Sequence, residues 1–146
     1  MERIARWVLR HAAELGRLVA AQGLSGVLRF AGPTGDIIGA LRDADVFVLP
    51  STNEPCSVAL IEALAAGVPA LVSASGGNVD LVRDGETGRL FTPGSARDLA
   101  LKLEEWMTGR VRLASPEWIR HSVGGCRASV VARQLHEIYR RWMARR

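Results

Sequence analysis

Apolar and polar positions follow a helical period at the start of the chain. Within residues 1–24, apolar side chains recur three or four positions apart, at Ile4, Val8, Ala12, Leu15 and Val19. This spacing predicts an amphipathic helix, and the charges between these positions exclude the apolar core of a signal peptide. Glycines interrupt the pattern after residue 22, and the run VLRFAG (27–32) predicts a short strand.

Continuous apolar runs and helical patterns alternate through the rest of the chain. Buried strands are expected at DVFVLPS (45–51) and ALVS (70–73), with a smaller strand at 89–91. Helices are expected at 37–44, 57–67, from residue 78 onward, at 95–107 and in the C-terminal part, 116–146. Gly67 with Pro69 beyond it is a typical helix end, and Ser95 is a candidate N-cap.

This order of elements predicts the fold class. Strands that alternate with helices form right-handed βαβ units and a parallel sheet. We therefore expect an α/β fold, a Rossmann-like parallel sheet flanked by helices, in a single domain over residues 1–146. Ligands of such sheets bind at the carboxyl ends of the strands. Two loops lie at that edge, one at 51–57 and one at 74–78.

The last expected helix carries an apolar face of its own, formed by Val131, Leu135, Ile138 and Trp142. We expect this face to pack onto the domain. The sequence also allows a second interpretation, in which the face seeks a separate partner, because exposed apolar patches commonly mark interaction sites.

Composition and charge narrow the classes of function. The chain has 146 residues, of which 48% are hydrophobic, and no run of about 18 apolar residues is present. The expected location is the cytoplasm, with peripheral contact to the inner face of a membrane. Residues 110–146 contain nine arginines against two glutamates. Nucleic acid is a candidate partner for such a segment, but no recognition motif accompanies it, so we expect none to bind.

Neither the cysteines nor the histidines form a pattern of metal ligands. Cys56 and Cys126 are far apart, and the three histidines are scattered singly. We therefore expect no metal site. Cys56 has no histidine near it in the sequence, so that a cysteine nucleophile is not expected either.

The stretch NEPCSVALIEALAAGVP (53–69) places two carboxylates around a helix start. Glu54 precedes the expected helix and Glu62 lies about one turn inside it. Unpaired N–H groups and the helix dipole favour a phosphate at such a position, and carboxylates accept hydrogen bonds from hydroxyls beside it. A nucleotide-sugar has this distribution of groups. By spacing alone, a dipole-stabilising Glu54 and a solvated Glu62 explain the pattern equally well.

The region 26–106 resembles the donor-binding half of the retaining glycosyltransferases of family 4, the group 1 glycosyl transferases. The resemblance rests on motifs in order: DVFVLPS, the two glutamates eight residues apart, EALAAGVP, the SGG loop and DGETG. It implies the GT-B fold, in which two Rossmann-like domains enclose a cleft, with this chain corresponding to the C-terminal domain. It also implies a nucleotide-diphosphate sugar as donor, with neither a cofactor nor a metal.

The resemblance further implies a role for each site residue. Glu54, the catalytic residue, would contact the hydroxyls of the donor sugar, and Glu62 would bind the ribose. The amides near Ser57 and Val58 would meet the pyrophosphate. The remaining donor-binding candidates are Cys56 beside this turn, Gly32 near the base, and Gly76 and Gly77 in the second loop.

Two parts of the family pattern are missing. The acceptor-binding domain is absent, as is the Gly-Arg and Lys-Gly segment whose basic pair neutralises the diphosphate, so the chain is expected to be truncated at its N-terminus. By resemblance, the missing strands lie between those at 27–32 and 45–51. Either the remaining strands close this gap, or a partner domain or chain completes the cleft, or the chain is part of a longer product.

The sequence thus supports two functions. The first is a glycosyltransferase component that transfers a glycosyl group, with retention, to a hydroxyl acceptor whose identity is unknown. The alternative is a truncated, non-catalytic domain that binds a nucleotide-sugar or another chain. The sequence does not decide whether this chain is active alone. A NAD-dependent dehydrogenase is disfavoured because no G-x-G-x-x-G follows a strand.

Overall fold

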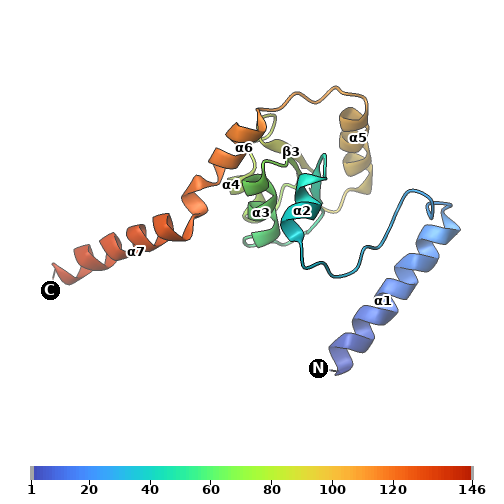
Figure 1. The fold of residues 1–146 in the computed structure, drawn as a ribbon, viewed down its shortest axis with the longest axis horizontal. Coiled ribbons are helices and arrows are strands. Elements are labelled where there is room, and N and C mark those ends of the chain that lie inside the picture. The colour runs from blue at the N-terminus through green and yellow to red at the C-terminus, as the bar shows by residue number, and fades with distance from the viewer. Residues whose placement is uncertain (1, 146) are drawn as a thin grey trace. The chain divides into compact units, whose positions relative to one another are not determined.

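The computed structural model describes residues 2–145, with side chains from residue 10 onward. The chain divides into two compact units, Met1–Gly35 and Asp36–Arg146, each of which is described here by itself (Figure 1). The single domain expected over residues 1–146 stays a prediction. No helix in the described part of the chain is long and apolar enough to cross a membrane.

The first unit contains the expected N-terminal helix but not the expected strand. Helix α1 spans Glu2–Ala21. The strand predicted at 27–32 is wrong, because the amides of Val27 and Leu28 both bond to the carbonyl of Leu24, at 3.0 and 2.9 Å, and thereby form a turn. Val27 and Phe30 are 83% and 55% exposed. The described residues of this unit contain no strand with which this short run could pair.

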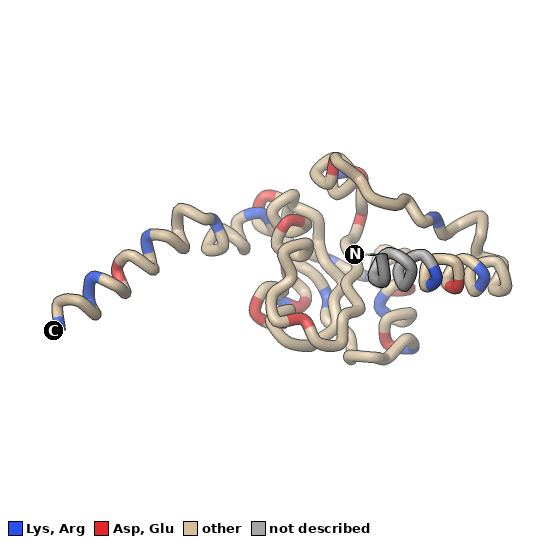
Figure 2. Tube along the Cα trace, turned by 90° about the horizontal axis from the view of Figure 1, so that it is seen from below, with Lys and Arg blue, Asp and Glu red and all other residues tan. Residues whose placement is uncertain are grey.

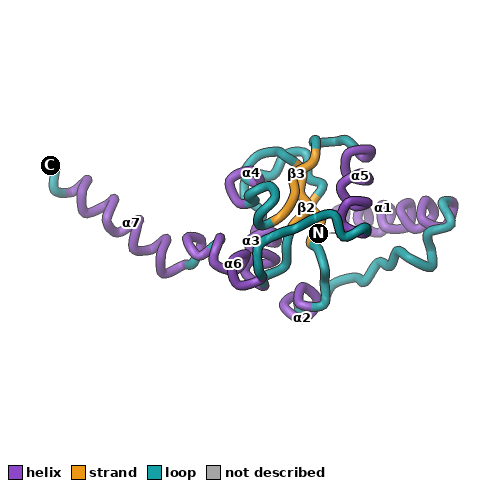
Figure 3. The backbone as a smooth tube through the Cα atoms, turned by 90° about the horizontal axis from the view of Figure 1, so that it is seen from above, coloured by secondary structure: helices purple, strands orange, loops and turns teal. Residues whose placement is uncertain are grey.

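The second unit is built on a parallel sheet, as the sequence predicts. Its strands are β1 (Phe47–Leu49), β2 (Ala70–Ser73) and β3 (Gly88–Phe91), in the order β1-β2-β3. Phe47 pairs with Ala70, and Ala70 with Gly88, so that β2 is the central strand (Figure 3). Within the described residues these strands are contiguous, and β1 forms one edge of the sheet.

Helices connect and flank these strands. They are α2 (Ile37–Arg42), α3 (Val58–Ala66), α4 (Asn78–Leu81), α5 (Ala96–Met107), α6 (Pro116–Ser122), the short 3-10 turn η1 (Gly124–Cys126) and α7 (Ala128–Met143). Every helix expected from the sequence is therefore present. Gly67 ends α3 in the left-handed conformation, with φ of 86°, as its position before Pro69 predicts.

The core lies where α3 packs between the sheet and α6. It consists of Leu60, Leu64, Ala70, Val72, Val82, Ile119 and Val123, each no more than 5% exposed. Burying one leucine side chain stabilises a fold by about 1.5–3 kcal/mol. Two leucines of α3 are fully buried in this cluster, so the packing fixes the position of α3 and of its N-terminus.

Helix α7 does not pack as expected. Val130 is half-buried beside η1, and the described residues from Val131 onward are exposed. The physical reason is that α6 already covers α3, because Ile119 and Val123 occupy that side of the core. The second interpretation of the apolar face, a separate partner, therefore stays open.

A hydrogen-bonded carboxylate at the start of α5 predicts a pH dependence of stability. The Asp98 carboxylate accepts bonds from the amide and the hydroxyl of Thr92, both at 2.7 Å, and these bonds hold the pKa of Asp98 below its usual value. Because the folded pKa is depressed, this stabilisation is present above the unfolded pKa of about 3.9 and is lost as pH falls through the folded pKa.

We expect the Asp98→Asn variant to melt at a lower temperature than the parent at pH 7, and the difference to shrink below about pH 4. Thermal unfolding followed by circular dichroism at pH 7 and pH 3 measures this. Asp45→Asn is the control, because the structure describes no hydrogen bond of the Asp45 side chain. An unchanged difference between parent and Asp98→Asn at the two pH values would contradict the assignment.

Candidate functional site

Two loops meet at the carboxyl ends of β1 and β2. The first runs from residue 50 to 57 and the second from 74 to 77. The amide of Gly77 donates to the carbonyl of Glu54 at 2.9 Å. The hydroxyls of Ser73 and Ser75 both donate to the carbonyl of Ser51, Ser75 at 3.0 Å. Backbone and side-chain bonds therefore hold the two loops together as one surface.

The two glycines of the second loop are required by this contact. Gly76 has φ of 53°, and a Cβ added there would overlap the Glu54 carbonyl oxygen and lie 2.8 Å from its carbon. A Cβ on Gly77 would overlap the carbonyl oxygen of Pro55. The sequence places these glycines at a ligand, whereas the structure gives them a role without one. They let the second loop press against the backbone that carries Glu54.

Asn78 stabilises the second loop through hydrogen bonds to Ser73, the last residue of β2. Asn78 was not identified as a site residue from the sequence. Its side chain is fully buried, and its amide nitrogen donates to the carbonyl of Ser73 at 3.1 Å and to the Ser73 hydroxyl at 3.4 Å. No partner for its Oδ1 atom is found among the described residues. The sequence did carry one signal for this role: an asparagine directly after Gly-Gly, in the loop that follows a buried strand. Backbone polar groups in such a loop need hydrogen-bond partners, and an asparagine side chain supplies them.

The first turn of α3 presents backbone amides at this surface. The hydroxyl of Ser57 caps the helix by accepting from the amide of Leu60 at 3.2 Å, and the Ser57 carbonyl accepts from Ile61 at 3.1 Å. In the described part of the chain, no acceptor is found for the amides of Ser57, Val58 or Ala59. The Ser57 side chain thus caps α3, and the backbone amides of Ser57, Val58 and Ala59 are available to donate hydrogen bonds to an anion.

The two glutamates flank these amides along the chain. Glu54 lies in the first loop and Glu62 in the second turn of α3, and both are half-buried. The structure describes no hydrogen bond or ion pair for either carboxylate. Because side chains on a helix lean toward its N-terminus, Glu62 extends toward the same end of α3.

The remaining predicted site residues lie in different settings. Cys56 is an exposed free thiol in the first loop. Gly32 belongs to the first unit, so the structure does not relate it to this surface. Among the residues described, no three histidine, cysteine or acidic side chains are grouped so as to hold a metal ion.

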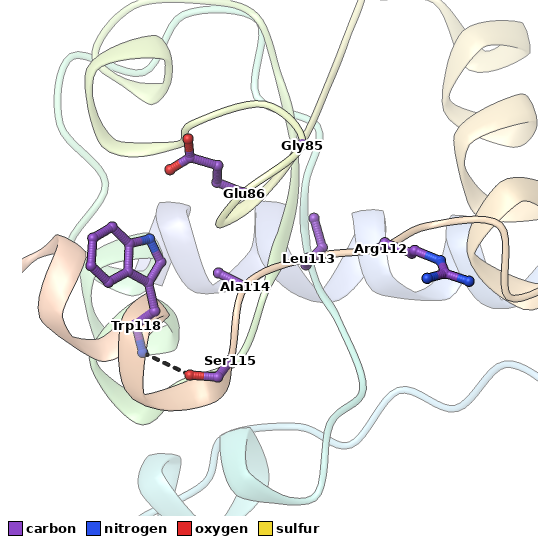
Figure 4. A pocket seen from close by; sticks show the side chains of 7 residues that line it. All are labelled: Gly85, Glu86, Arg112, Leu113, Ala114, Ser115 and Trp118. Carbon is purple, nitrogen blue, oxygen red and sulfur yellow. Dashed lines mark hydrogen bonds between the residues drawn. The ribbon is translucent and has the colours of Figure 1, made fainter.

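A separate hollow of about 610 Å³ lies at the amino end of the sheet. Figure 4 shows Trp118 on one side of it, Glu86 on another, and the chain from Arg112 to Ser115 crossing it. Two of its polar groups have other partners: Glu86 pairs with Arg83 at 3.7 Å, and the Ser115 hydroxyl accepts from the Trp118 amide at 3.3 Å. We therefore assign it no ligand.

Comparisons with known proteins agree with the motifs of this region. The family model described as glycosyl transferases group 1 matches residues 10–117 of the 146-residue chain. The D-inositol 3-phosphate glycosyltransferase of Streptomyces coelicolor is 45% identical over 78 residues, covering 52% of this chain and 17% of that protein. The lipopolysaccharide core biosynthesis glycosyltransferase LpsE of Rhizobium meliloti is 35% identical over 114 residues, covering 74% of this chain and 34% of that protein. The chain thus spans about a sixth to a third of these relatives.

Solved structures show the same fold. The Anabaena protein Alr3699/HepE, in complex with UDP, superposes with a TM-score of 0.78 at 26% identity. The superposition covers 90% of this chain and 37% of that one. The same protein in complex with UDP-glucose gives a TM-score of 0.75.

Proposed function

Because this chain belongs to the group 1 glycosyl transferases, we propose that it binds a nucleotide-diphosphate sugar at the N-terminus of α3. The observation that carries the proposal is the surface formed by the two bonded loops. It presents three backbone amides without described acceptors, and Glu54 and Glu62 lie on either side of them in the chain. The solved complexes of the related Anabaena protein with UDP and UDP-glucose support this class of ligand.

The diphosphate is the part of the donor that the amides accommodate. Amides at a helix N-terminus, together with the helix dipole, stabilise a phosphate group. The same groups stabilise the charge that develops on the diphosphate as it leaves, without the helix having to rearrange. We expect no metal or cofactor in this interaction, because the amides of Ser57, Val58 and Ala59 supply the donors.

The carboxylates are assigned to hydroxyl groups on either side of the diphosphate. We assign Glu62 to the ribose and Glu54 to the transferred sugar, because an ionised carboxylate accepts hydrogen bonds from both hydroxyls of a diol. Cys56, Gly76 and Gly77 border the same surface. The role of Gly32 near the base stays a prediction, because Gly32 belongs to the first unit.

The proposed reaction is glycosyl transfer with retention to a hydroxyl acceptor. The bond from the sugar's anomeric carbon to the diphosphate oxygen breaks, and a bond to the acceptor oxygen forms. The acceptor's proton passes to the departing diphosphate. No covalent bond to the protein is needed. The acceptor would approach from a domain or chain that completes the cleft.

A second function, binding without catalysis, is favoured by one specific observation. Neither loop, 50–57 or 74–77, contains a lysine or arginine to neutralise the departing diphosphate. A chain that binds the donor but lacks this charge would hold a nucleotide-sugar without transferring the sugar. The expected cytoplasmic location and the peripheral membrane contact both stay predictions.

Calorimetric titration with UDP-glucose, GDP-glucose and ADP-glucose tests the donor site. We expect saturable binding of at least one donor, weakened about tenfold or more by Glu62→Gln, because hydrogen bonds to a charged group contribute about 1.5–3 kcal/mol. Glu104→Gln on α5 removes the same charge from an exposed position and is expected to leave the affinity unchanged.

Equal affinities for the parent and Glu62→Gln would refute the assignment of Glu62. Product analysis in the same samples separates the two functions. Release of free sugar or its transfer to an added acceptor supports catalysis, whereas donor binding without turnover supports the binding domain.

A further inference from the structure

The side chain of Asn78 closes the second loop onto the end of the strand before it. Its Nδ2 atom donates to the carbonyl of Ser73 at 3.1 Å, and this carbonyl also accepts from the amide of Ser75 at 2.8 Å. The backbone amide of Asn78 donates to the carbonyl of Ser75 at 3.2 Å. Residues 74–77 are therefore held between two ends that are bonded to each other.

The closed loop holds the first loop in two places. The amide of Gly77, the residue before Asn78, donates to the carbonyl of Glu54 at 2.9 Å. The hydroxyl of Ser73 donates to the carbonyl of Ser51 and accepts from Nδ2 of Asn78 at 3.4 Å. Asn78 thus takes part in both connections to the backbone that carries Glu54.

The stability of the fold does not by itself require an asparagine at this position. The Asn78 side chain is 0% exposed, and no donor to its Oδ1 atom is found among the described residues. Burial of an amide with an unbonded oxygen costs free energy, which leucine, branching at the same atom, avoids. If Nδ2 were removed, the Ser73 carbonyl would keep the Ser75 amide as its donor. The contribution of the amide therefore lies in the placement of the loops.

Neutral groups alone place the second loop. Residues 63–79 contain no charged side chain, so that this part of the chain is tan throughout in Figure 2. Hydrogen bonds between neutral groups depend on distance and direction at a single contact. A neutral residue in place of Asn78 thus alters the geometry of the loops and leaves the charge at the site unchanged.

The N-terminus of α3 is fixed independently of Asn78. Two leucines of this helix are fully buried in the core, and the Ser57 hydroxyl caps the helix within its own first turn. No described hydrogen bond joins Asn78 to α3. Loosening the second loop should therefore displace Glu54 while the amides of α3 and the Glu62 side chain stay in place.

We propose that Asn78 is a positioning residue for the sugar-binding half of the donor site. It holds the second loop closed, and the closed loop holds the backbone that carries Glu54. This inference rests on the proposed function, in which Glu54 meets the transferred sugar and the first turn of α3 meets the diphosphate. It adds that the two halves of the donor are held by parts of the structure that can be disturbed separately.

Calorimetric titration of the full chain with UDP-glucose and with UDP tests this separation, followed by the corresponding GDP and ADP pairs. We expect Asn78→Leu to weaken the binding of the nucleotide-sugar about fivefold and that of the nucleoside diphosphate by less than about twofold. The urea midpoint of the variant is expected to be unchanged or higher. A purely structural role of Asn78 would instead lower the midpoint and weaken both ligands together.

Ser73→Ala is the second variant, and it serves also if Asn78→Leu does not fold. It removes the hydroxyl between Asn78 and the Ser51 carbonyl without adding volume, and we expect the same selective loss of nucleotide-sugar affinity. The matched control is Thr87→Val. The Thr87 side chain is also fully buried, and its hydroxyl accepts from the Arg83 amide at 3.0 Å, before the start of β3. This control should lower the urea midpoint and leave both affinities unchanged.

Hydrogen exchange followed by NMR tests the positioning without any ligand. We expect the Gly77 amide to exchange about fivefold faster in Asn78→Leu than in the parent, while the amides within α3 exchange at the same rate. An unchanged Gly77 rate would overturn the inference. So would equal losses for the nucleotide-sugar and the nucleoside diphosphate, or no loss for either, in a folded Asn78→Leu variant.

Failure of the proposed function has a different signature. In that case the parent chain itself binds none of the six ligands, and the donor site is refuted together with the role of Asn78 in it. Faster exchange at Gly77 in Asn78→Leu would then still show that Asn78 holds the two loops together.

Discussion

Alanine in place of Gly88 is expected to destabilise the second unit by about 3 kcal/mol. Gly88 is buried and pairs with Ala70 in the ladder that joins β3 to the central strand. An added Cβ would overlap the carbonyl oxygen of Ala70 and lie 2.9 Å from its carbon and 3.1 Å from its nitrogen. All three atoms belong to the backbone, so no side chain can turn away, and β2 and β3 must separate to admit the methyl group.

Urea denaturation followed by circular dichroism measures this loss as a lower midpoint. Gly124→Ala is the matched control, because a Cβ there meets nothing within 4 Å, and we expect its effect to stay within about 0.5 kcal/mol. Equal urea midpoints for the two variants would mean that β2 and β3 can separate to admit the methyl group without lowering the free energy of unfolding.

Alanine in place of Gly76 is expected to cost about 2–4 kcal/mol and to weaken donor binding as well. Two effects combine. A residue with a side chain at φ of 53° costs about 1 kcal/mol or more, and the overlap with the backbone of Glu54 adds about 1–3 kcal/mol. Relief of this overlap must move the loop that carries Glu54, which is why the donor affinity should fall together with stability.

Gly94→Ala separates the two effects. Gly94 has φ of 74°, and a Cβ there meets nothing within 4 Å, so only the backbone term of about 1 kcal/mol is expected. Urea denaturation and donor titration of both variants give the comparison. If Gly76→Ala and Gly94→Ala are equally stable, the close approach of the two loops contributes nothing measurable.

Local signals account for the parts of the fold that were predicted correctly. Continuous apolar runs located β1 and β2, and the helix ends at Ser57, Gly67 and Ser95 were readable because capping depends on neighbouring residues. The incorrect strand at 27–32 has the opposite cause. A strand exists only through its neighbours, and no local pattern reports whether a neighbour is present.

In the candidate site, too, the features encoded within one short segment were predicted, whereas most of those that depend on contacts between distant segments were not. The helix start and the two glutamates were identified from sequence, since they belong to one short segment. The crowding at Gly76 and Gly77 was not, because it depends on Glu54 and Pro55, more than twenty positions away. The hydrogen bonds of Asn78 to Ser73 span only five positions, and they were missed because the place of Asn78 after Gly-Gly does not by itself show that its side chain turns inward. The packing predicted for α7 failed for a related reason: α6 competes for the same face of α3. The ligand roles of Glu54 and Glu62 stay predictions until the titrations are done.

The order of the strands also bears on how the second unit folds. Each strand pairs with the next one along the chain, Phe47 with Ala70 and Ala70 with Gly88. Every ladder therefore closes a short loop, and the entropy lost in closing a loop grows with its length. Sheets whose paired strands are close in sequence fold faster than sheets whose paired strands are far apart in sequence. The pairing of β1 with β2 therefore needs no segment beyond residue 73, whereas the core around α3 closes only when α6 brings Ile119 into it.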